Sequence, residues 1–245
     1  ILEDLSDIWS IIPSSRTGAG STLKCDLLSR RDRTALLEHD FRLVVNTAAA
    51  ATPSFCRSNP GKAWILNTEW PVILAEHCRE NGIPLIHFSS DLVYSGGTPP
   101  YTEASTAVPL SFYGWTKLIA DVLVLKKNPE ALIVRTSVLC GETQSDRKTF
   151  SQDILSGKVT RVFVDSWRNH TPLHWLAGIL PELVSKKESG LVLASGKYSQ
   201  SRSAYAEALL VKHGRSTEHL IQEYAPPGIP SRLCLRGSYY TSSVY

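Results

Sequence analysis

Tyr113 and Lys117, separated by three residues, have the types and spacing that point most directly to chemistry. Positions four apart on an α-helix share one face, so a helix here would place the phenol beside the ammonium. A free tyrosine has a pKa near 10, and a neighbouring cation lowers that value by stabilising the phenolate. Such a tyrosine can act as a general acid at neutral pH. The spacing alone is weak evidence, because chance produces it in many chains.

Ser89 and Ser90 follow an apolar run at 85–88. Ligands of an open parallel sheet bind at the carboxyl ends of its strands, where these serines would lie. Ser90 could therefore donate a hydrogen bond to a substrate carbonyl beside Tyr113. The alternative is that the two serines only turn the chain or cap a helix.

The elements that must position these residues alternate along the first 140 residues. Short apolar runs predict strands, and stretches with helical spacing of apolar residues predict helices. The alternation predicts a doubly wound α/β fold with a parallel, Rossmann-type sheet. The predicted strands cover 8–12, 43–45, 85–88 and 131–134, and the predicted helices cover 33–38, 63–80 and 113–125.

Pro71 interrupts the second of these helical stretches, so we expect the long helix to start or bend there. Asn81 and Gly82 tolerate positive φ and should end it. Beyond residue 141 the pattern loosens into a strand at 159–164, a helix at 173–186, a strand at 191–194 and a helix at 203–212.

Two parts of the chain follow from this pattern. We expect a dinucleotide-binding domain over 1–141. A smaller substrate-binding lobe should cover most of 142–245, with some of its segments returning to the first domain.

Composition bounds the class of protein. The 245 residues carry a formal charge of +3 and are 42% hydrophobic and 20% charged, values typical of a soluble globular protein. No stretch approaches the roughly 20 apolar residues of a membrane span, and the basic residues are scattered, which disfavours nucleic-acid binding. Five cysteines without a C-x-x-C pair indicate free thiols in a reducing compartment. No signal peptide is evident, so we expect a cytoplasmic protein. We also expect no metal site.

Four ordered segments resemble the dTDP-4-dehydrorhamnose reductase family of extended short-chain dehydrogenases, within the NAD-dependent epimerase/dehydratase superfamily. Relatives of that family include the regulatory β subunit of methionine adenosyltransferase. The resemblance covers roughly 24–141 well and the remainder loosely. The segments are V-V-N-T-A-A-A, S-S-D-L-V-Y-S-G-G-T-P-P-Y-T-E, Y-G-W-T-K and V-R-T-S-V-L-C-G.

The resemblance implies catalytic roles for four residues. Tyr113 matches the general acid that protonates the substrate carbonyl oxygen. Lys117 matches the residue that lowers the pKa of that tyrosine and holds the nicotinamide ribose hydroxyls. Ser90 matches the Ser/Thr position that polarises the carbonyl. Asn67 matches the helix asparagine that supports a proton-relay water, although an ordinary polar residue of a helix is the alternative.

The resemblance also implies cofactor and substrate contacts. Arg16 stands where an arginine commonly meets the 2′-phosphate of NADP, whereas an acidic residue there would favour NAD; a surface arginine is the alternative. NADP is thus the preferred cofactor and NAD the second choice. The other predicted cofactor contacts are Asp26, Leu27, Asn46, Ala48, Ala49, Thr136 and Ser137, together with Tyr113 and Lys117. The predicted substrate contacts are Ser90, Leu92, Val138, Arg168 and His170.

Three features depart from the expected pattern. Val138 replaces an aromatic residue that packs on the sugar in rhamnose-pathway reductases, so the sugar is not identified. His170 could equally be a structural histidine. The glycines at 18 and 20 follow the strand predicted at 8–12, which corresponds to the second strand of the family's fold. We expect the first strand and its glycine-rich turn to lie outside this sequence, which begins at Ile1 and contains no methionine. A protein without that turn would bind the cofactor pyrophosphate poorly.

The sequence predicts a reductase that transfers hydride from NADPH to a carbonyl, plausibly of a keto-sugar nucleotide, with Tyr113 as the proton donor. An epimerase or dehydratase with a recycled NAD is one alternative. A non-catalytic, NADP-binding regulatory subunit is the other. We expect a small-molecule substrate, no nucleic-acid or membrane partner, and leave a homodimer open.

Overall fold

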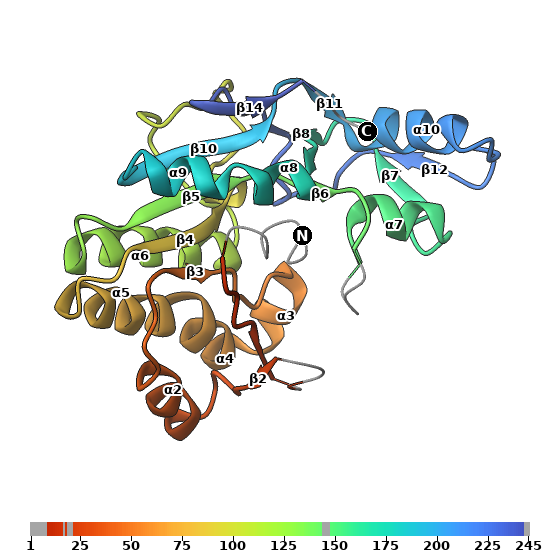
Figure 1. The fold of residues 1–245 in the computed structure, drawn as a ribbon. Coiled ribbons are helices and arrows are strands. Elements are labelled where there is room, and N and C mark those ends of the chain that lie inside the picture. The colour runs from red at the N-terminus through yellow and green to blue at the C-terminus, as the bar shows by residue number, and fades with distance from the viewer. Residues whose placement is uncertain (1–8, 17, 19–21, 144–147, 243–245) are drawn as a thin grey trace. The chain divides into compact units, whose positions relative to one another are not determined.

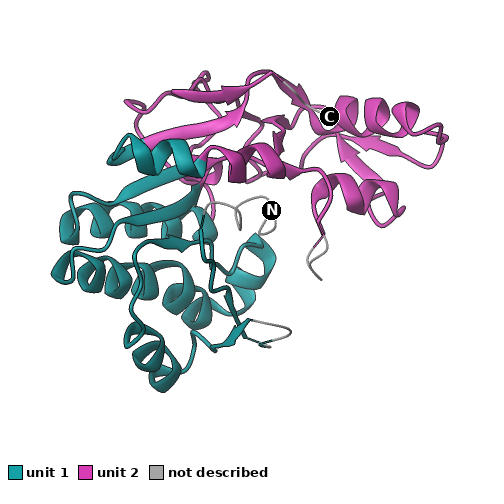
Figure 2. Ribbon diagram, viewed as in Figure 1, with its two compact units in different colours: residues 1–89, 112–134, 180–191 teal, residues 90–111, 135–179, 192–245 magenta. Residues whose placement is uncertain are grey.

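The computed structural model describes residues 9–16, 18, 22–143 and 148–242 (Figure 1). By density of contacts the chain divides into a first unit of residues 1–89, 112–134 and 180–191 and a second unit of residues 90–111, 135–179 and 192–245 (Figure 2). Each unit is interrupted in sequence. The predicted boundary at residue 141, between a dinucleotide-binding domain and a substrate-binding lobe, stays a prediction.

A five-stranded sheet carries the strands predicted near 43, 85, 131 and 191, and these predictions are confirmed to within two residues at their starts. β3 pairs with β4 in parallel, with Val44 opposite Leu85, and β10 pairs with β14 in parallel. The strand order is β14-β10-β5-β4-β3. The strands are β3 (Val44–Asn46), β4 (Leu85–Ser90), β5 (Leu132–Thr136), β10 (Gly190–Gly196) and β14 (Tyr239–Thr241).

The strand predicted at 8–12 is wrong where the structure describes it, because residues 9–12 have no regular structure; Ile8 lies outside the described residues. The strand β1 (Ser14–Ser15) begins only after Pro13 and pairs in parallel with β2 (Leu23–Lys24) in a separate two-stranded sheet. Hydrophobicity alone predicts a strand at 8–12. Hydrophobicity does not determine which residues find a backbone partner.

The helices predicted in the first unit are confirmed, with one refinement at Pro71. A π-helical turn over Ile65–Glu69 precedes the helix that begins at Trp70, and Pro71, which has no N–H to donate, follows directly on this turn. Gly82, with φ +64°, follows the helix end at Asn81 as expected. The helices are α2 (Arg30–Leu37), α3 (Pro53–Ser58), α4 (Pro60–Trp64), α5 (Trp70–Glu80), α6 (Phe112–Lys127) and α9 (Leu180–Ser185).

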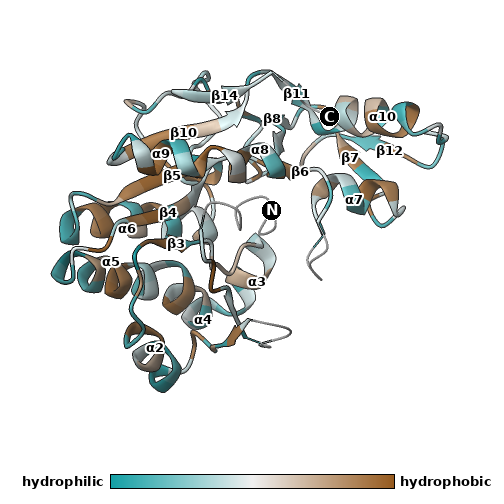
Figure 3. Cartoon of the chain, in the orientation of Figure 1, coloured by the Kyte–Doolittle hydropathy of each residue, from teal (hydrophilic) through white to brown (hydrophobic). Residues whose placement is uncertain are grey.

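The core of the first unit forms between the apolar faces of α5, α6 and the strands. Figure 3 shows hydrophobic colouring on β5 and along parts of α5 and α6. On α5 the buried positions recur at three- and four-residue spacing, which directs one face of the helix inward. The buried cluster consists of Trp70, Leu74, Ala75, Cys78, Leu85, Val124, Ala131 and Ile133.

The second unit holds short strands and helices. The predicted strand at 159–164 is β7 (Arg161–Phe163), and the predicted helix at 203–212 is α10 (Arg202–Lys212). The other elements are the 3-10 helix η2 (Asp91–Val93), α7 (Phe150–Leu155), α8 (Leu173–Gly178), β6 (Leu139–Cys140), β8 (Trp167–Asn169), β9 (Thr171–Pro172), β11 (Ser199–Ser201), β12 (Ile221–Glu223) and β13 (Arg232–Leu233).

The single helix predicted at 173–186 is wrong, because two helices occupy that range. α8 ends at Gly178 and α9 begins at Leu180. Pro181 lies in the first turn of α9. Its ring would clash with the preceding turn of a continuous helix, and it has no N–H to donate.

Gly196 ends β10 where the backbone of His170, between β8 and β9, approaches closely. A Cβ at this position would overlap the backbone carbonyl oxygen of His170. The carbonyl oxygen of Gly196 also accepts a hydrogen bond from Asn169 Nδ2 at 2.6 Å. Only a glycine allows this approach without displacing the backbone.

We expect Gly196→Ala to lower the free energy of unfolding by about 1–3 kcal/mol or more, because the new methyl group has no space. The matched control is Gly178→Ala on α8 of the same unit, where a Cβ meets no atom within 4 Å. Urea unfolding of both variants measures the difference. Equal stabilities would show that the chain relaxes around the methyl group at residue 196.

Candidate active site

Tyr113 and Lys117 both lie on α6, as predicted, and both are buried in the first unit. They are four residues apart, so their side chains leave the same face of the helix. Lys117 is only 1% exposed. A lysine is rarely this deeply buried without partners, so its contacts define the local chemistry.

The ammonium group of Lys117 is held against the middle of β4. Nζ donates to the backbone oxygen of Phe88 at 2.7 Å and lies 3.1 Å from Nε2 of His87. Burial lowers the pKa of Lys117 to about 8, against the opposing attraction of Asp121 one turn further along α6. Lys117 therefore gains or loses its proton near neutral pH rather than far above it.

Asn67 lies in the π-helical turn, and its amide connects the loop after β3 to α6. Its Oδ1 accepts from Ala50 N at 2.7 Å, while Nδ2 donates to Ala50 O at 3.1 Å and to Thr116 Oγ1 at 3.0 Å. Thr116 Oγ1 in turn donates to the backbone oxygen of Tyr113 at 2.7 Å. These bonds position the helix turn that carries the tyrosine. The predicted relay water stays a prediction.

Asn46 and the small residues after it lie at the end of β3. Asn46 Oδ1 accepts from Ala48 N at 3.2 Å, and Nδ2 lies 3.0 Å from His87 Nδ1. Ala48 and Ala49 are half-buried. Asn46, His87 and Lys117 thus form a continuous polar chain within the first unit.

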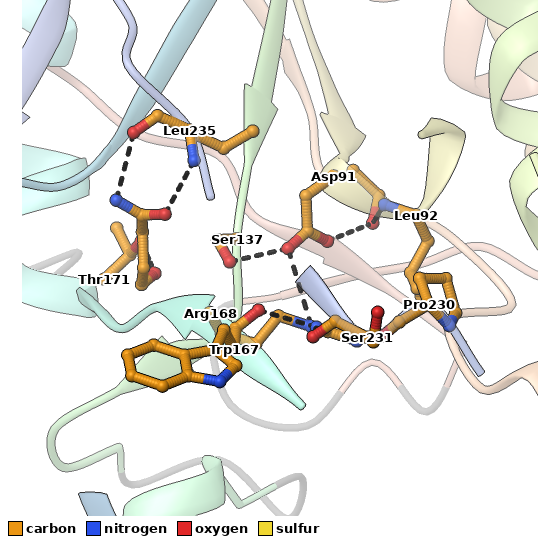
Figure 4. A network of polar contacts seen from close by, with 11 residues as sticks. Asp91, Leu92, Ser137, Trp167, Arg168, Thr171, Pro230, Ser231 and Leu235 are labelled. Carbon is orange, nitrogen blue, oxygen red and sulfur yellow. Dashed lines mark hydrogen bonds and ion pairs between the residues drawn. The ribbon is translucent and has the colours of Figure 1, made fainter. Parts of the chain in front are cut away.

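In the second unit, Asp91 contacts three polar side chains that the sequence predicted separately (Figure 4). Its Oδ1 accepts from Ser90 Oγ at 3.3 Å, and its Oδ2 accepts from Ser137 Oγ at 2.6 Å. Arg168 Nε lies 3.9 Å from the same Oδ2. Burial raises the pKa of Asp91, and Arg168 and the two serines oppose that rise.

Arg168 also binds the backbone of two segments. Its guanidinium donates to Trp167 O at 2.7 Å and to Pro230 O at 2.9 Å (Figure 4). Burial lowers the pKa of Arg168, and Asp91 opposes that effect. The contacts fasten β8 to the segment before β13. Whether Arg168 also meets a substrate stays a prediction.

His170 is 1% exposed and lies in a stack of aromatic rings. Its ring is parallel to that of Tyr205 at a centroid distance of 3.8 Å, and Phe150 follows at 6.1 Å. Neither ring nitrogen has a hydrogen-bond partner among the residues that the structure describes. Burial, followed by the charges of Arg202 and Arg168, lowers the pKa of His170 to about 3.

The remaining predicted residues are distributed over the two units. Arg16 is exposed directly after β1, and Asp26 Oδ1 accepts from Leu28 N at 3.0 Å. Leu27 packs against the core of the first unit. In the second unit, Thr136 is buried and Leu92 and Val138 are half-buried.

Ser90 belongs to the second unit, whereas Tyr113 and Lys117 belong to the first. The meeting of these three side chains therefore stays a prediction. His87, Asp91 and Thr116 also belong to the polar networks, although they were not among the predicted site residues. The signal for His87 was present, because it is a lone polar residue within the apolar run at 85–88.

An open surface pocket of about 520 Å³ lies in the first unit, and none of the residues of these networks lines it. Among the described residues there is no cluster of His, Cys, Asp and Glu that could hold a metal ion, and no helix there is long and apolar enough to cross a bilayer. The pocket is lined by Leu37, Glu38, His39, Asp40, Phe41, Arg42, His77, Asn81, Gly82 and Ile83.

The parallel sheet and its connecting helices define an α/β protein of the Rossmann type. Residues 8–227 match the family model described as the RmlD substrate binding domain. The chain belongs to this family.

Two proteins of similar sequence differ in function. Methionine adenosyltransferase 2 subunit beta of Rattus norvegicus is 34% identical over 160 residues, covering 62% of this chain and 47% of that protein. A probable low-salt glycan biosynthesis reductase of Haloferax volcanii is 32% identical over 179 residues, covering 70% and 60%. The chain spans less than two thirds of the length of either relative.

A solved structure shares the fold. The dTDP-4-dehydrorhamnose reductase of Bacillus anthracis, crystallised with NADP, matches with a TM-score of 0.78 at 19% identity. The match covers 90% of this chain and 77% of that chain. At this identity the likeness shows the fold alone.

The buried ring of His170 predicts a loss of stability in acid. An unfolded histidine binds a proton near pH 6.5, whereas the folded protein resists protonation of His170 until about pH 3. Stability is therefore lost as pH falls from 6.5 towards 3, by about 2 kcal/mol between pH 7 and pH 5. We expect His170→Phe, which keeps the ring stack, to remove this part of the pH dependence.

Unfolding at pH 7 and at pH 5 measures the effect, with the exposed His219→Phe as the control. The control should follow the unaltered protein at both pH values. If His170→Phe loses as much stability in acid as the unaltered protein does, then His170 is not excluded from protonation by its surroundings.

Proposed function

We propose that the chain carries the catalytic machinery of an NAD(P)-dependent reductase that acts on a carbonyl group. The observation that carries the proposal is that Tyr113 and Lys117 lie four residues apart on one buried face of α6, with Nζ donating to Phe88 O within β4. A fixed cation beside a phenol stabilises the phenolate and makes the tyrosine a usable proton donor. The named reductase of Haloferax volcanii supports the same class of reaction.

The residues present fit a nicotinamide cofactor. Two of the three N–H bonds of the Lys117 ammonium have partners at Phe88 and His87, which leaves a third for a ribose hydroxyl. The half-buried Ala48 and Ala49 leave room for a flat group against the backbone. Bound NADPH or NADH supplies the hydride for the carbonyl carbon. NADP is preferred because Arg16 is exposed and available for a 2′-phosphate.

In this proposal Tyr113 donates its phenolic proton to the carbonyl oxygen as negative charge develops there. Lys117 holds positive charge beside the resulting phenolate. The role predicted for Ser90 is not part of this proposal, because Ser90 belongs to the second unit, where its hydroxyl donates to Asp91 Oδ1 at 3.3 Å and accepts from Leu92 N at 3.2 Å. The proposed substrate is a keto-sugar nucleotide, on the strength of the dTDP-4-dehydrorhamnose reductase that shares the fold. Asn67, through Thr116, holds the turn that carries Tyr113.

We expect Tyr113→Phe to lower kcat by about 10²-fold or more, because general acid catalysis contributes on that order. Cofactor affinity should change little, since the ring and Lys117 remain. Oxidation of NADPH with dTDP-4-dehydrorhamnose measures turnover, and calorimetric titration with NADPH measures affinity. Tyr224→Phe is the control, because Tyr224 is 78% exposed.

Unchanged turnover in Tyr113→Phe would refute the role of this residue. Conversion of a keto-sugar without net consumption of NADPH would instead identify an epimerase or dehydratase that recycles NAD.

A second candidate function is that of a non-catalytic, nucleotide-binding subunit. The 34% identity to the β subunit of a methionine adenosyltransferase favours it. This function predicts co-purification with a stoichiometric partner protein and no NADPH oxidation against a panel of keto-sugar nucleotides. Size-exclusion chromatography after mild affinity purification, followed by the same oxidation assay, separates the two candidates.

A further inference from the structure

His87 is a fully buried polar residue in the otherwise apolar start of β4. Both of its ring nitrogens have partners within the first unit. Nε2 lies 3.1 Å from Nζ of Lys117, and Nδ1 lies 3.0 Å from Nδ2 of Asn46. The imidazole therefore bridges β3 and α6 inside the protein.

The hydrogen positions in the polar chain of Asn46, His87 and Lys117 constrain one another. Asn46 Oδ1 accepts from Ala48 N, so the NH₂ end of the amide faces His87 Nδ1. Nδ1 must then carry a lone pair. Since burial and the charge of Lys117 hold the pKa of His87 well below its ordinary value, the ring is neutral. With the Asn46 amide in this orientation, the one ring proton lies on Nε2.

This arrangement conflicts with a charged Lys117. An Nε2–H group and an ammonium cannot both donate to each other across 3.1 Å. The conflict is resolved if Lys117 is an amine, which accepts from Nε2–H and still donates to Phe88 O. It is also resolved if Lys117 is an ammonium that donates to a bare Nε2, with the ring proton on Nδ1. In that case the Asn46 amide must turn its oxygen to Nδ1 and give up the bond from Ala48.

We propose that His87 is a positioning residue for Lys117, whose ring changes tautomer when Lys117 gains or loses a proton while the Asn46 amide turns in step. The charged arrangement holds four exchangeable protons, three on Nζ and one on Nδ1. The neutral arrangement holds three, two on Nζ and one on Nε2. One proton passes to solvent between them.

The groups around the pair keep both arrangements accessible. Asp121, further along α6, favours the ammonium, and Ser89 Oγ donates to Asp121 Oδ2 at 3.0 Å. Burial favours the amine and brings the pKa of Lys117 to about 8. Tyr113 lies one turn earlier on the same face of α6. The exchange is thus expected near pH 8.

The value of this coupling to catalysis rests on the proposed function, in which the ammonium of Lys117 stabilises the phenolate of Tyr113. His87 and Asn46 would then set the pH at which that support is lost. The coupling itself needs neither cofactor nor substrate, so it can be tested apart from the reductase activity.

The test is nitrogen NMR of the protein labelled with ¹⁵N-histidine, followed from pH 6 to pH 10. His87→Gln identifies the His87 signals by their loss. We expect the Nδ1–H tautomer at the acidic end, the Nε2–H tautomer at the alkaline end, and a midpoint near pH 8. In Lys117→Met, which removes the ammonium, the change of tautomer should be absent. A single tautomer throughout, or the same midpoint in Lys117→Met, overturns the proposal.

Asn46→Asp provides an independent test, because a carboxylate can accept from Ala48 N and from Nδ1–H at once. It should hold the ring in the Nδ1–H form and raise the NMR midpoint by one pH unit or more. The alkaline limb of kcat at saturating cofactor should move by the same amount. An NMR midpoint that stays in place overturns the coupling, and a limb that stays while the midpoint moves overturns its role in turnover.

Discussion

The polar network of the first unit depends on the burial of the Lys117 side chain, which is only 1% exposed. Lys117 keeps a strong acceptor at Phe88 O, but desolvation weakens its hold on its proton. The residues around it are then constrained in turn. His87 can meet Nζ only with a compatible tautomer, and Asn46 can meet His87 only with a compatible amide orientation. A polar chain in a low-dielectric interior is costly unless each member is satisfied.

The local pattern of apolar residues was sufficient to predict many of the helices and strands. The helix of Tyr113 and Lys117 and the strands at β3, β4 and β5 could be predicted, because apolar periodicity reflects burial directly. The π-helical turn before Trp70 could only be predicted as an interruption at Pro71, since the proline shows where a regular helix fails but not what replaces it. The break between α8 and α9 carried the same signal at Pro181, which the apolar spacing outweighed in the prediction.

The polar networks were less accessible to sequence reasoning. Tyr113 and Lys117 could be paired because helical spacing brings positions four apart together. His87 lies thirty residues before Lys117 and Asn46 forty-one before His87, so only the parallel pairing of β3 with β4 and the packing of α6 make them neighbours. Asp91 lies in the segment S-S-D-L-V-Y, which resembles the family, yet its partners Ser137 and Arg168 come from later segments. Helical spacing relates only residues three or four positions apart, so it could not predict these contacts.

The Asp91 carboxylate has a consequence for how the second unit can change over time. It accepts from Ser137 at the end of β5 and pairs with Arg168 on β8. Loss of the acid alone would leave a buried guanidinium without its counter-charge, and loss of the guanidinium alone would leave a buried carboxylate, each at a cost of several kcal/mol. Evolution can therefore replace the pair stepwise only through costly intermediates. The two positions should be inherited together, or exchanged together for an uncharged set of similar volume.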